Sequence, residues 1–439
     1  MRASGLAKVS QDPAVVQLSH RINLLRCAAL YGANASGKSN LVEAMQFARS
    51  MIVAEPAAKD AAIVVHPFRL DEASRQLPSV FEFVFFAAGS IYEYQFSVNR
   101  REVVHERIAI LSTDDPTQER ELFRREGAEF TFSPSFRAST EDPKFLDYVA
   151  RGTRANQLFL NEAYERDIGP LLPIYRWFFS TLIIIKPDTR YGPLVEDAER
   201  EPRFKEFLKG VLEWADTGII GVDTRRSKVD DGVKKEVDAI RKSKRARPLL
   251  QELARLNPTR DALIELEDGQ AEVLSLHFQH RSDAGSEFMD VDDESDGTMR
   301  LLDLAPMLYL AKEHAPVYVV DELDRSLHTI LAQRLVERFI TETGGGGTAP
   351  LPQLIFTTHD TNLLDCHRLT PECIWFAEKN RSGASEFYSL GEYDPEQIRE
   401  MCGSLEKGYL QGRFGGIPFL GSPERLGWME PRTPTPDEV

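Results

Sequence analysis

Residues 32–39 read GANASGKS and match the pattern G-x-x-x-x-G-K-[ST] in full. In this pattern, Gly32 and Gly37 let the backbone wrap closely around a phosphate group, whose negative charge is favoured at a helix N-terminus. Lys38 reaches the β- and γ-phosphates, and the hydroxyl group of Ser39 is a Mg²⁺ ligand. At average residue frequencies, such a match arises by chance in only about 1–2% of chains of this length. The pattern therefore predicts a nucleotide-binding loop, the P-loop, whose binding residues are Gly32, Asn34, Ala35, Ser36, Gly37, Lys38, Ser39 and Asn40.

The segments on either side of the P-loop have the patterns that this chemistry requires. Residues 23–31 (NLLRCAALY) are mostly apolar, which fits a buried parallel strand. After the loop, Leu41, Ala44, Met45 and Ala48 recur at helical spacing. A strand, a loop and a helix in this order disfavour the alternative, a Gly/Ser loop with an incidental lysine.

A second acidic element follows the apolar run VYVV at 317–320, which ends in Asp321 and Glu322. Alone, two acids after a strand would indicate a solvated helix start. In a chain with a P-loop, we expect one of these two carboxylates to be a Mg²⁺ ligand and the other to orient the attacking water.

Two further polar positions extend this site. Ser295 precedes an apolar helix in an N-cap position, 26 residues before Asp321, so the segment Ser295–Gly297 is either a simple cap or a phosphate-sensing element. His359 ends the strand pattern QLIFTTH, where it is either structural or a contact to the γ-phosphate. The order of the motifs favours the functional interpretation of both positions, with His359 in a catalytic role.

The order P-loop, signature (Ser295–Gly297), Asp-Glu pair and histidine resembles the ABC-type ATPase heads of recombination and chromosome-maintenance proteins. More closely, the chain is similar to bacterial AAA-family ATPases of the ABC-like subgroup, members of which accompany anti-phage and abortive-infection effectors. The resemblance covers roughly residues 20–110 and 270–420. Its motifs are YGANASGKSNLVEAM, ESDGTMRLLDLAPML, VDELDRSLH, FTTHDTNLLD and GRFGGIP.

This resemblance implies that Ser295 and Gly297 contact the ATP of a facing protomer and that Leu323-Asp324 forms the D-loop. It also implies that Glu322 is the catalytic base, which leaves Asp321 as the Mg²⁺ ligand. Such heads begin with a strand or two before the P-loop strand, which help to cover the adenine. Here the roughly 20 preceding residues are unpromising for strands. The adenine contact and the Q-loop glutamine therefore stay unassigned.

Hydrophobic periodicity divides the chain into four segments. Residues 1–134 hold the P-loop and an antiparallel meander with period-two alternation over 79–111. Residues 135–265 are predicted to be a helical insertion, residues 266–425 hold the other motifs, and the Pro-rich residues 426–439 are predicted to be disordered. The predicted fold class is α/β: a P-loop NTPase, of the ABC-type ATPase head kind, with an antiparallel β-meander and an inserted helical region.

Composition limits the remaining classes. The chain of 439 residues is 42% hydrophobic and 28% charged, which excludes a wholly disordered protein. The most apolar stretch, residues 177–185, is far shorter than the roughly 20 residues that span a bilayer. The four cysteines form no CxxC pair and favour reduced thiols, and the N-terminus lacks the apolar core of a secretion signal. We therefore expect a cytoplasmic protein with no membrane partner.

Two charged segments admit competing interpretations. Residues 225–248 hold ten basic and four acidic residues, which fits either a solvated helix face or a surface that docks nucleic acid or protein. The net charge of −16 argues against non-specific DNA coating.

The acidic segment DVDDE (290–294) resembles a nuclease metal site but is better explained as a solvated loop. Only 80 residues follow His359, so we expect any nuclease activity to belong to a partner.

The predicted function is that of an ATPase that binds ATP and Mg²⁺ and acts as a nucleotide-switched sensor or regulator of a partner effector in anti-phage defence. That effector would be a nuclease or a toxin. Because one chain carries one P-loop and one signature, we expect a homodimer or a higher homo-oligomer bridged by ATP. Two alternatives stay open: a DNA-repair type ATPase that acts on DNA, and a nucleotide-bridged scaffold with little turnover.

Overall fold

The computed structural model describes residues 13–19, 22–55, 57–112, 118–228, 262–265, 271–283, 285–311, 315–342, 351–365 and 368–417. The basic run 225–248, interpreted either as a solvated helix face or as a docking surface for nucleic acid or protein, is described only as far as Lys228, so most of it lies outside these residues. The predicted tail 426–439 also lies outside them.

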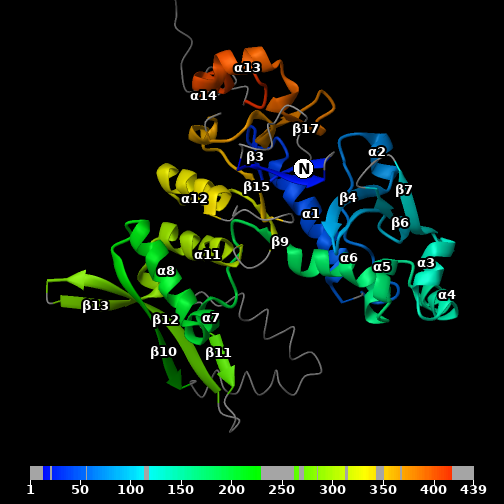
Figure 1. Cartoon of the computed structure of the whole chain (residues 1–439), viewed down its shortest axis with the longest axis horizontal. Coiled ribbons are helices and arrows are strands. Elements are labelled where there is room, and N and C mark those ends of the chain that lie inside the picture. The colour runs from blue at the N-terminus through cyan, green and yellow to red at the C-terminus, as the bar shows by residue number, and fades with distance from the viewer. Residues whose placement is uncertain are drawn as a thin grey trace, which may run out of the picture.

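A six-stranded sheet forms the centre of the molecule, in the order β17–β16–β3–β15–β14–β9 (Figure 1). Only β17 runs antiparallel to its neighbour, so the carboxyl ends of the other five strands meet at one edge. β15 lies between the P-loop strand β3 and the strand β14 that leads to Asp321. The strands are β3 (Cys27–Tyr31), β9 (Leu182–Ile185), β14 (Val317–Val320), β15 (Gln353–Thr357), β16 (Ile374–Lys379) and β17 (Ser385–Ser389).

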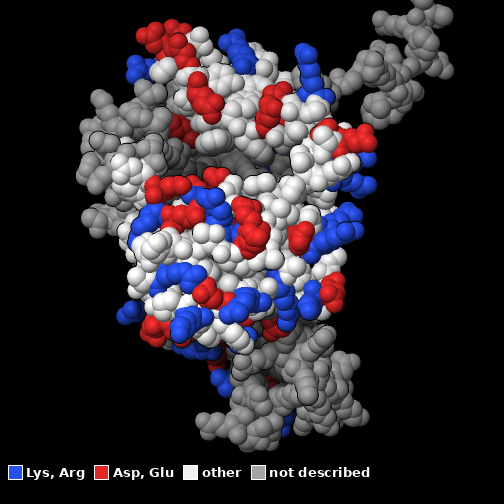
Figure 2. Space-filling model, turned by 90° about the vertical axis from the view of Figure 1, so that its right-hand side faces the viewer, with Lys and Arg blue, Asp and Glu red and all other residues white. Residues whose placement is uncertain are grey.

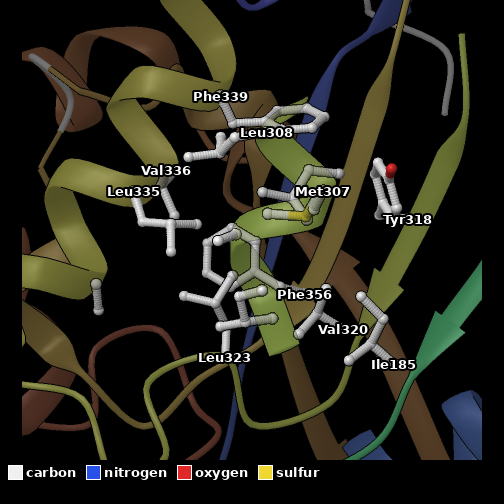
Figure 3. Packing of buried hydrophobic residues seen from close by; sticks show 14 of the residues in the cluster. Ile185, Met307, Leu308, Tyr318, Val320, Leu323, Leu335, Val336, Phe339 and Phe356 are labelled. Carbon is white, nitrogen blue, oxygen red and sulfur yellow. The ribbon is translucent and has the colours of Figure 1, made fainter. Parts of the chain in front are cut away.

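Helices bury both faces of this sheet. On one face, α11 (Asp296–Leu310) and α12 (Thr329–Glu342) interleave with the strands. Figure 3 shows this contact, in which Met307 and Leu308 of α11 and Phe339 of α12 lie against Tyr318, Val320 and Phe356 of the sheet. On the other face lies α1 (Lys38–Val53), whose Val42, Ala48 and Ile52 are buried. Near the carboxyl edge, α13 (Pro395–Met401) and α14 (Leu405–Leu410) follow β17 in the chain.

The predicted meander is confirmed as a five-stranded antiparallel sheet, in which Tyr92, Tyr94 and Phe96 are buried on one face. Its strands are β4 (Ser79–Ala87), β5 (Ser90–Val98), β6 (Val103–Leu111), β7 (Glu119–Glu126) and β8 (Glu129–Phe132), preceded by α2 (Glu72–Gln76). Four helices pack beside it: α3 (Pro134–Ser139), α4 (Pro143–Gly152), α5 (Phe159–Glu165) and α6 (Leu172–Arg176). We call this unit the meander lobe.

On the side that carries the meander lobe, positive and negative side chains are interspersed (Figure 2). Arg107, for example, contacts the carboxylates of Glu93, Glu119 and Glu121, with a distance of 2.9 Å to Glu121. Neither sign of charge dominates the described residues on this side.

The expectation that no strand precedes the P-loop strand is wrong. β1 (Val15–Ser19) and β2 (Ile22–Leu25) form an antiparallel hairpin there. The predicted continuous strand 23–31 is interrupted at Arg26, whose buried guanidinium group donates a hydrogen bond to the carbonyl oxygen of Ile340 at 2.6 Å. A cation at the C-terminal end of α12 is favourable, and this contact turns the chain between β2 and β3.

The expectation of helix throughout 135–265 is also wrong in part. The β-branched run LIII forms β9 in the central sheet, directly after a π-helix at Trp177–Thr181. A second, antiparallel sheet contains β10 (Ile219–Lys228), β11 (Ala262–Glu265), β12 (Ala271–Ser282) and β13 (Gly285–Asp290). Two helices, α7 (Leu194–Arg200) and α8 (Pro202–Trp214), precede β10. The division into four segments stays a prediction.

Two further observations bear on the expected cell compartment. Among the described helices, none is both long enough and apolar enough to cross a membrane. Cys27 and Cys373 are buried free thiols, whereas Cys402 is disulfide-bonded, so the expectation of reduced thiols is wrong for Cys402. A cytoplasmic location stays a prediction.

Candidate nucleotide-binding site

The P-loop leaves β3 and enters α1 through glycines that tight packing requires. A Cβ atom on Gly32 would lie 2.5 Å from the carbonyl oxygen of Ala377, and one on Gly37 would collide with the side chain of Ser385. Gly37, with φ 109°, also has a left-handed conformation that favours glycine. The neighbouring strands β16 and β17 therefore hold the loop closely from behind.

The polar groups of the P-loop divide into a buried set and an exposed set. Lys38 is buried, and its Nζ atom donates to the carbonyl oxygens of Gly32 at 2.6 Å and Ala33 at 3.2 Å. Burial lowers the pKa of Lys38, and the nearby Asp321 carboxylate opposes this shift. Ser36 is also buried. The exposed residues of the loop are Asn34, Ala35, Ser39 and Asn40.

Asp321 meets the P-loop across the end of β15. The hydroxyl group of Ser39 donates to Oδ1 of Asp321 at 3.3 Å, although the two residues are 282 positions apart. Thr357 of β15 donates to the same carboxylate oxygen at 2.6 Å and accepts from the amide group of Glu322 at 2.8 Å. The sequence interpretation missed Thr357; its place two positions before His359, at the end of an apolar strand pattern, was the available signal.

Glu322 has an unusual backbone conformation for a non-glycine residue, with φ 48°. Such strain persists only where the surrounding structure holds it. The buried Arg300 of α11 supplies that support, because its NH2 atom donates to the carbonyl oxygens of Asp321 and Glu322, both at 3.0 Å. Its NH1 atom donates to the carbonyl oxygen of Lys186 at 3.2 Å. The sequence interpretation missed Arg300, although a lone cation within an apolar helix pattern was a signal.

His359 follows β15 and lies at the same edge of the sheet. Its amide group donates to Oδ2 of Asp324 at 3.4 Å. Although its side chain is exposed, partial loss of hydration lowers the pKa of His359, and the charge of Lys38 lowers it further. Asp324, Glu322 and Asp321 act in the opposite direction. The structure thus brings His359 into the electrostatic field of Lys38 and the acidic residues.

The signature residues lie beside the segment that follows β14. The exposed Ser295 is the N-cap of α11, and its hydroxyl oxygen accepts from the amide group of Thr298 at 3.2 Å. A Cβ atom on Gly297 would lie 2.8 Å from the carbonyl oxygen of Ser326. Within the described ranges, no hydrogen bond or ion pair joins Ser295 or Gly297 to the P-loop of the same chain.

The residues at this edge fit a nucleotide with Mg²⁺. The 16-residue helix α1 points its N-terminus at the loop and has no acidic residue in its first turn. The Ser39 hydroxyl group and the Asp321 carboxylate are the hard oxygen ligands that Mg²⁺ prefers, usually alongside phosphate oxygens. The buried Oγ atom of Ser36 has no hydrogen-bond partner among the described protein atoms. The site therefore combines a pair of oxygen groups suited to Mg²⁺ with a backbone loop suited to anions.

Comparison with solved structures finds similarity to one titled "Crystal structure of the SmcHead bound to the C-winged helix domain of ScpA". The identity is 15%, the TM-score is 0.31, and the alignment covers 88% of this chain and 97% of that chain. At this TM-score, the likeness supports no inference about function. No curated protein matches the chain.

A family model matches residues 27–365, which hold the P-loop, the signature, the Asp-Glu pair and His359. Its description reads "AAA domain, putative AbiEii toxin, Type IV TA system". Together with the parallel sheet and the P-loop, this match confirms the predicted α/β P-loop NTPase fold. Because the match covers more than half of the sequence, the chain belongs to this family of AAA-domain ATPases.

Proposed function

We propose that the chain is an ATP-hydrolysing switch that binds Mg-ATP at the P-loop and signals through association with a second copy. The observation that carries this proposal is the approach of Ser39 to Asp321 at 3.3 Å. A metal-binding hydroxyl group and a carboxylate from distant parts of the sequence meet at the N-terminus of α1. In this position they would hold Mg²⁺, which neutralises phosphate charge when bound.

Asp321, Glu322 and His359 have different roles in this proposal. Thr357 fixes Asp321 for the metal, while Glu322 is only half-buried and has its backbone fixed by Arg300. The Glu322 carboxylate lies 3.8 Å from NH1 of Arg325, beyond hydrogen-bond distance, so it can accept a hydrogen bond from a water molecule and act as the base. With its pKa lowered, His359 is mostly neutral at pH 7 and can donate a single N–H group to an anion.

The position of the signature supports a site shared by two protomers. Ser295 is exposed at an N-cap, where a helix N-terminus favours an anion. It has no contact with the P-loop of its own chain in the described ranges. A nucleotide held by Lys38 of one protomer would therefore meet Ser295 and Gly297 of another, so that binding favours association and hydrolysis reverses it.

The test uses Glu322→Gln, which keeps the side-chain shape but removes the base. We expect it to bind Mg-ATP, to lose turnover by about 100-fold or more, and to accumulate as a dimer or larger assembly in light scattering after chromatography. The exposed Glu396→Gln is the matched control. If Glu322→Gln hydrolyses ATP at the wild-type rate, Glu322 is not the base. If its molecular mass in light scattering is the same with and without Mg-ATP, the shared site is excluded.

Ser295→Asp sharpens this test, because aspartate keeps an N-cap acceptor while adding a charge that repels phosphate. In the Glu322→Gln background it should prevent the ATP-dependent assembly without weakening ATP binding to the single chain. Ser295→Thr keeps the cap without the charge and should still assemble. Assembly of the Ser295→Asp variant would contradict a contact between the signature and the γ-phosphate.

The downstream role that we propose is control of a partner effector in anti-phage defence. The family description places its AAA domain in a toxin–antitoxin context, "putative AbiEii toxin, Type IV TA system", and it names no partner. Phosphate release measured with and without DNA separates the alternatives. DNA-stimulated release would indicate a repair-type ATPase, and ATP-dependent assembly without release would indicate a scaffold.

A further inference from the structure

The loop Gly412–Ile417, with the sequence GRFGGI, lies behind the P-loop and has no role in the mechanism above. It follows α14 and contains three glycines with positive φ: 77° at Gly412, 68° at Gly415 and 66° at Gly416. These conformations strain other residues, so the loop has a defined shape that glycine makes accessible. We call it the glycine loop.

Contacts with β16 and β17 fix the glycine loop. Phe414 is buried and stacks on Phe376 of β16, with ring centroids 5.7 Å apart. Tyr388 of β17 donates its hydroxyl hydrogen to the carbonyl oxygen of Phe414 at 2.7 Å. A Cβ atom on Gly415 would lie 2.6 Å from Oε2 of Glu378. The loop is therefore anchored to the same strands that press against the P-loop.

The glycine loop also contacts the first glycine of the P-loop. A Cβ atom on Gly416 would lie 3.6 Å from Cα of Gly32. Tyr409 of α14 connects the two, because its hydroxyl group donates to the carbonyl oxygen of Gly416 at 3.1 Å. The ring of Tyr409 also meets the ring of Tyr31, the residue before Gly32, edge-on with the ring centroids 6.0 Å apart.

Gly32 is thus held on two sides of its backbone. Its carbonyl oxygen accepts from Lys38 at 2.6 Å, and its Cα atom packs against Gly416 of the glycine loop. When Lys38 binds a phosphate group, its three N–H donors are shared between that group and the P-loop carbonyl oxygens. The packing of Gly416 against Gly32 does not compete with phosphate and can stay. Pre-organised backbone lowers the entropy that binding costs.

We propose that Tyr409 and the glycine loop are a positioning element for nucleotide binding, which holds Gly32 in the phosphate-binding conformation while Lys38 turns toward the phosphate groups. This inference rests on the proposed function, because it presumes that the P-loop binds ATP. It goes beyond that function by assigning a role to the GRFGGIP motif and to a tyrosine that does not touch the nucleotide.

The first test is Tyr409→Phe, which removes one hydroxyl group and keeps the ring that stacks on Phe376 at 5.5 Å. We expect Mg-ATP to bind about three- to tenfold more weakly in calorimetric titration, the usual effect of losing one hydrogen bond. The melting temperature without nucleotide should fall by no more than the few degrees that the loss of one buried hydrogen bond causes. Tyr393→Phe is the matched control, because Tyr393 contacts Phe414 edge-on yet no described hydrogen bond joins its hydroxyl group to the P-loop.

The second test is Gly416→Ala, which strains the loop at φ 66° although its Cβ atom would meet Gly32 at an ordinary contact distance. It too should weaken Mg-ATP binding. Gly89→Ala is its control, since Gly89 has φ 81° with open space around it in the β4–β5 turn. Gly89→Ala should leave nucleotide affinity unchanged.

The outcomes are separable. Wild-type protein that binds no Mg-ATP would overturn the proposed function itself. If the wild type binds and Tyr409→Phe binds equally well, the positioning role is wrong while the ATPase assignment stands. Equal losses of affinity and melting temperature in Tyr409→Phe and Tyr393→Phe would also overturn it, because they would show a general effect on packing.

Discussion

The nucleotide edge of the central sheet and the core of the meander lobe both bury charged groups, but they satisfy them differently. In the meander lobe, Glu106 is fully buried and lies 3.8 Å from Arg125. Its carboxylate accepts from the hydroxyl group of Tyr94 at 3.0 Å and from the amide groups of Phe159 and Leu160 at 2.6 and 3.0 Å. Glu106 therefore caps α5 from the neighbouring sheet.

Arg125 completes this network through carbonyl oxygens. Its guanidinium group donates to Gly127 at 2.7 Å, to Gln157 at 2.6 Å and to Arg154 at 3.1 Å. All three nitrogen atoms of the guanidinium group thus have a partner. A buried ion pair that is satisfied in this way ties β6 and β7 to the segment before α5 and binds nothing else.

At the nucleotide edge of the central sheet, by contrast, some buried polar groups are not paired within the protein. Several of its buried polar atoms have no hydrogen-bond partner among the described protein atoms: Tyr31 Oη, Ser36 Oγ, Arg300 Nε, Asp324 Oδ1 and Asp360 Oδ2. Buried polar groups are normally paired, and exceptions need an explanation. The meander lobe also has one such atom, Oδ1 of Asn156, but its buried charges are paired among its own elements. The comparison teaches that the unpaired polar groups gather at the sheet edge, where a ligand could pair them.

The largest effect that we expect from this comparison follows Glu106→Ala. It leaves the Arg125 charge buried without its anion, so the free energy of unfolding should fall by about 3–5 kcal/mol in urea denaturation. Glu126→Ala removes an exposed carboxylate from the same sheet and should cost less than about 1 kcal/mol. The folded fraction of Glu106→Ala should bind Mg-ATP normally. Weakened binding there would show that the two regions are not separable.

A smaller, site-specific effect should follow Arg300→Met. The apolar replacement cannot hold the carbonyl oxygens of Asp321 and Glu322, so the strained backbone of Glu322 is free to relax. We expect single-turnover hydrolysis to slow by about 10- to 100-fold, the size of a misplaced catalytic group, with Mg-ATP affinity changed little. The exposed Arg334→Met of α12 is the control. A loss of affinity as large as the loss of rate would contradict a role confined to Glu322.

The sequence was most informative where function depends on neighbours along the chain. The P-loop, the strand that ends at Asp321 and the meander each carry their signal within a short window, and the structure contains the predicted elements. Arg300 and Thr357 could not be found in this way, because their roles depend on pairing between strands and helices far apart in sequence. The hairpin β1–β2 was missed since its pattern is short. The roles of Glu322, His359, Ser295 and Gly297 stay predictions.

The smallest effect concerns pH. The pKa of His359 is lowered in the folded protein by loss of hydration and by the charge of Lys38. A histidine whose pKa is lowered on folding contributes stability that is present above its unfolded pKa, about 6.5, and lost as the pH falls through the lower folded pKa. The melting temperatures of the wild type and of His359→Asn should therefore differ by a constant amount above pH 7. Below about pH 6.5, the wild type should lose stability relative to the variant.

NMR titration of the His359 ring tests the cause. In Lys38→Met the positive charge is gone, so the pKa of His359 should rise toward its usual value. Mg-ATP added to the wild type should raise it as well, because the phosphate groups bring negative charge to the same edge. The buried network around Glu106 contains no group that the nucleotide can reach. The groups of that network should therefore not respond to Lys38→Met or to Mg-ATP. If neither Lys38→Met nor Mg-ATP changes the pKa of His359, this histidine does not face the phosphate site.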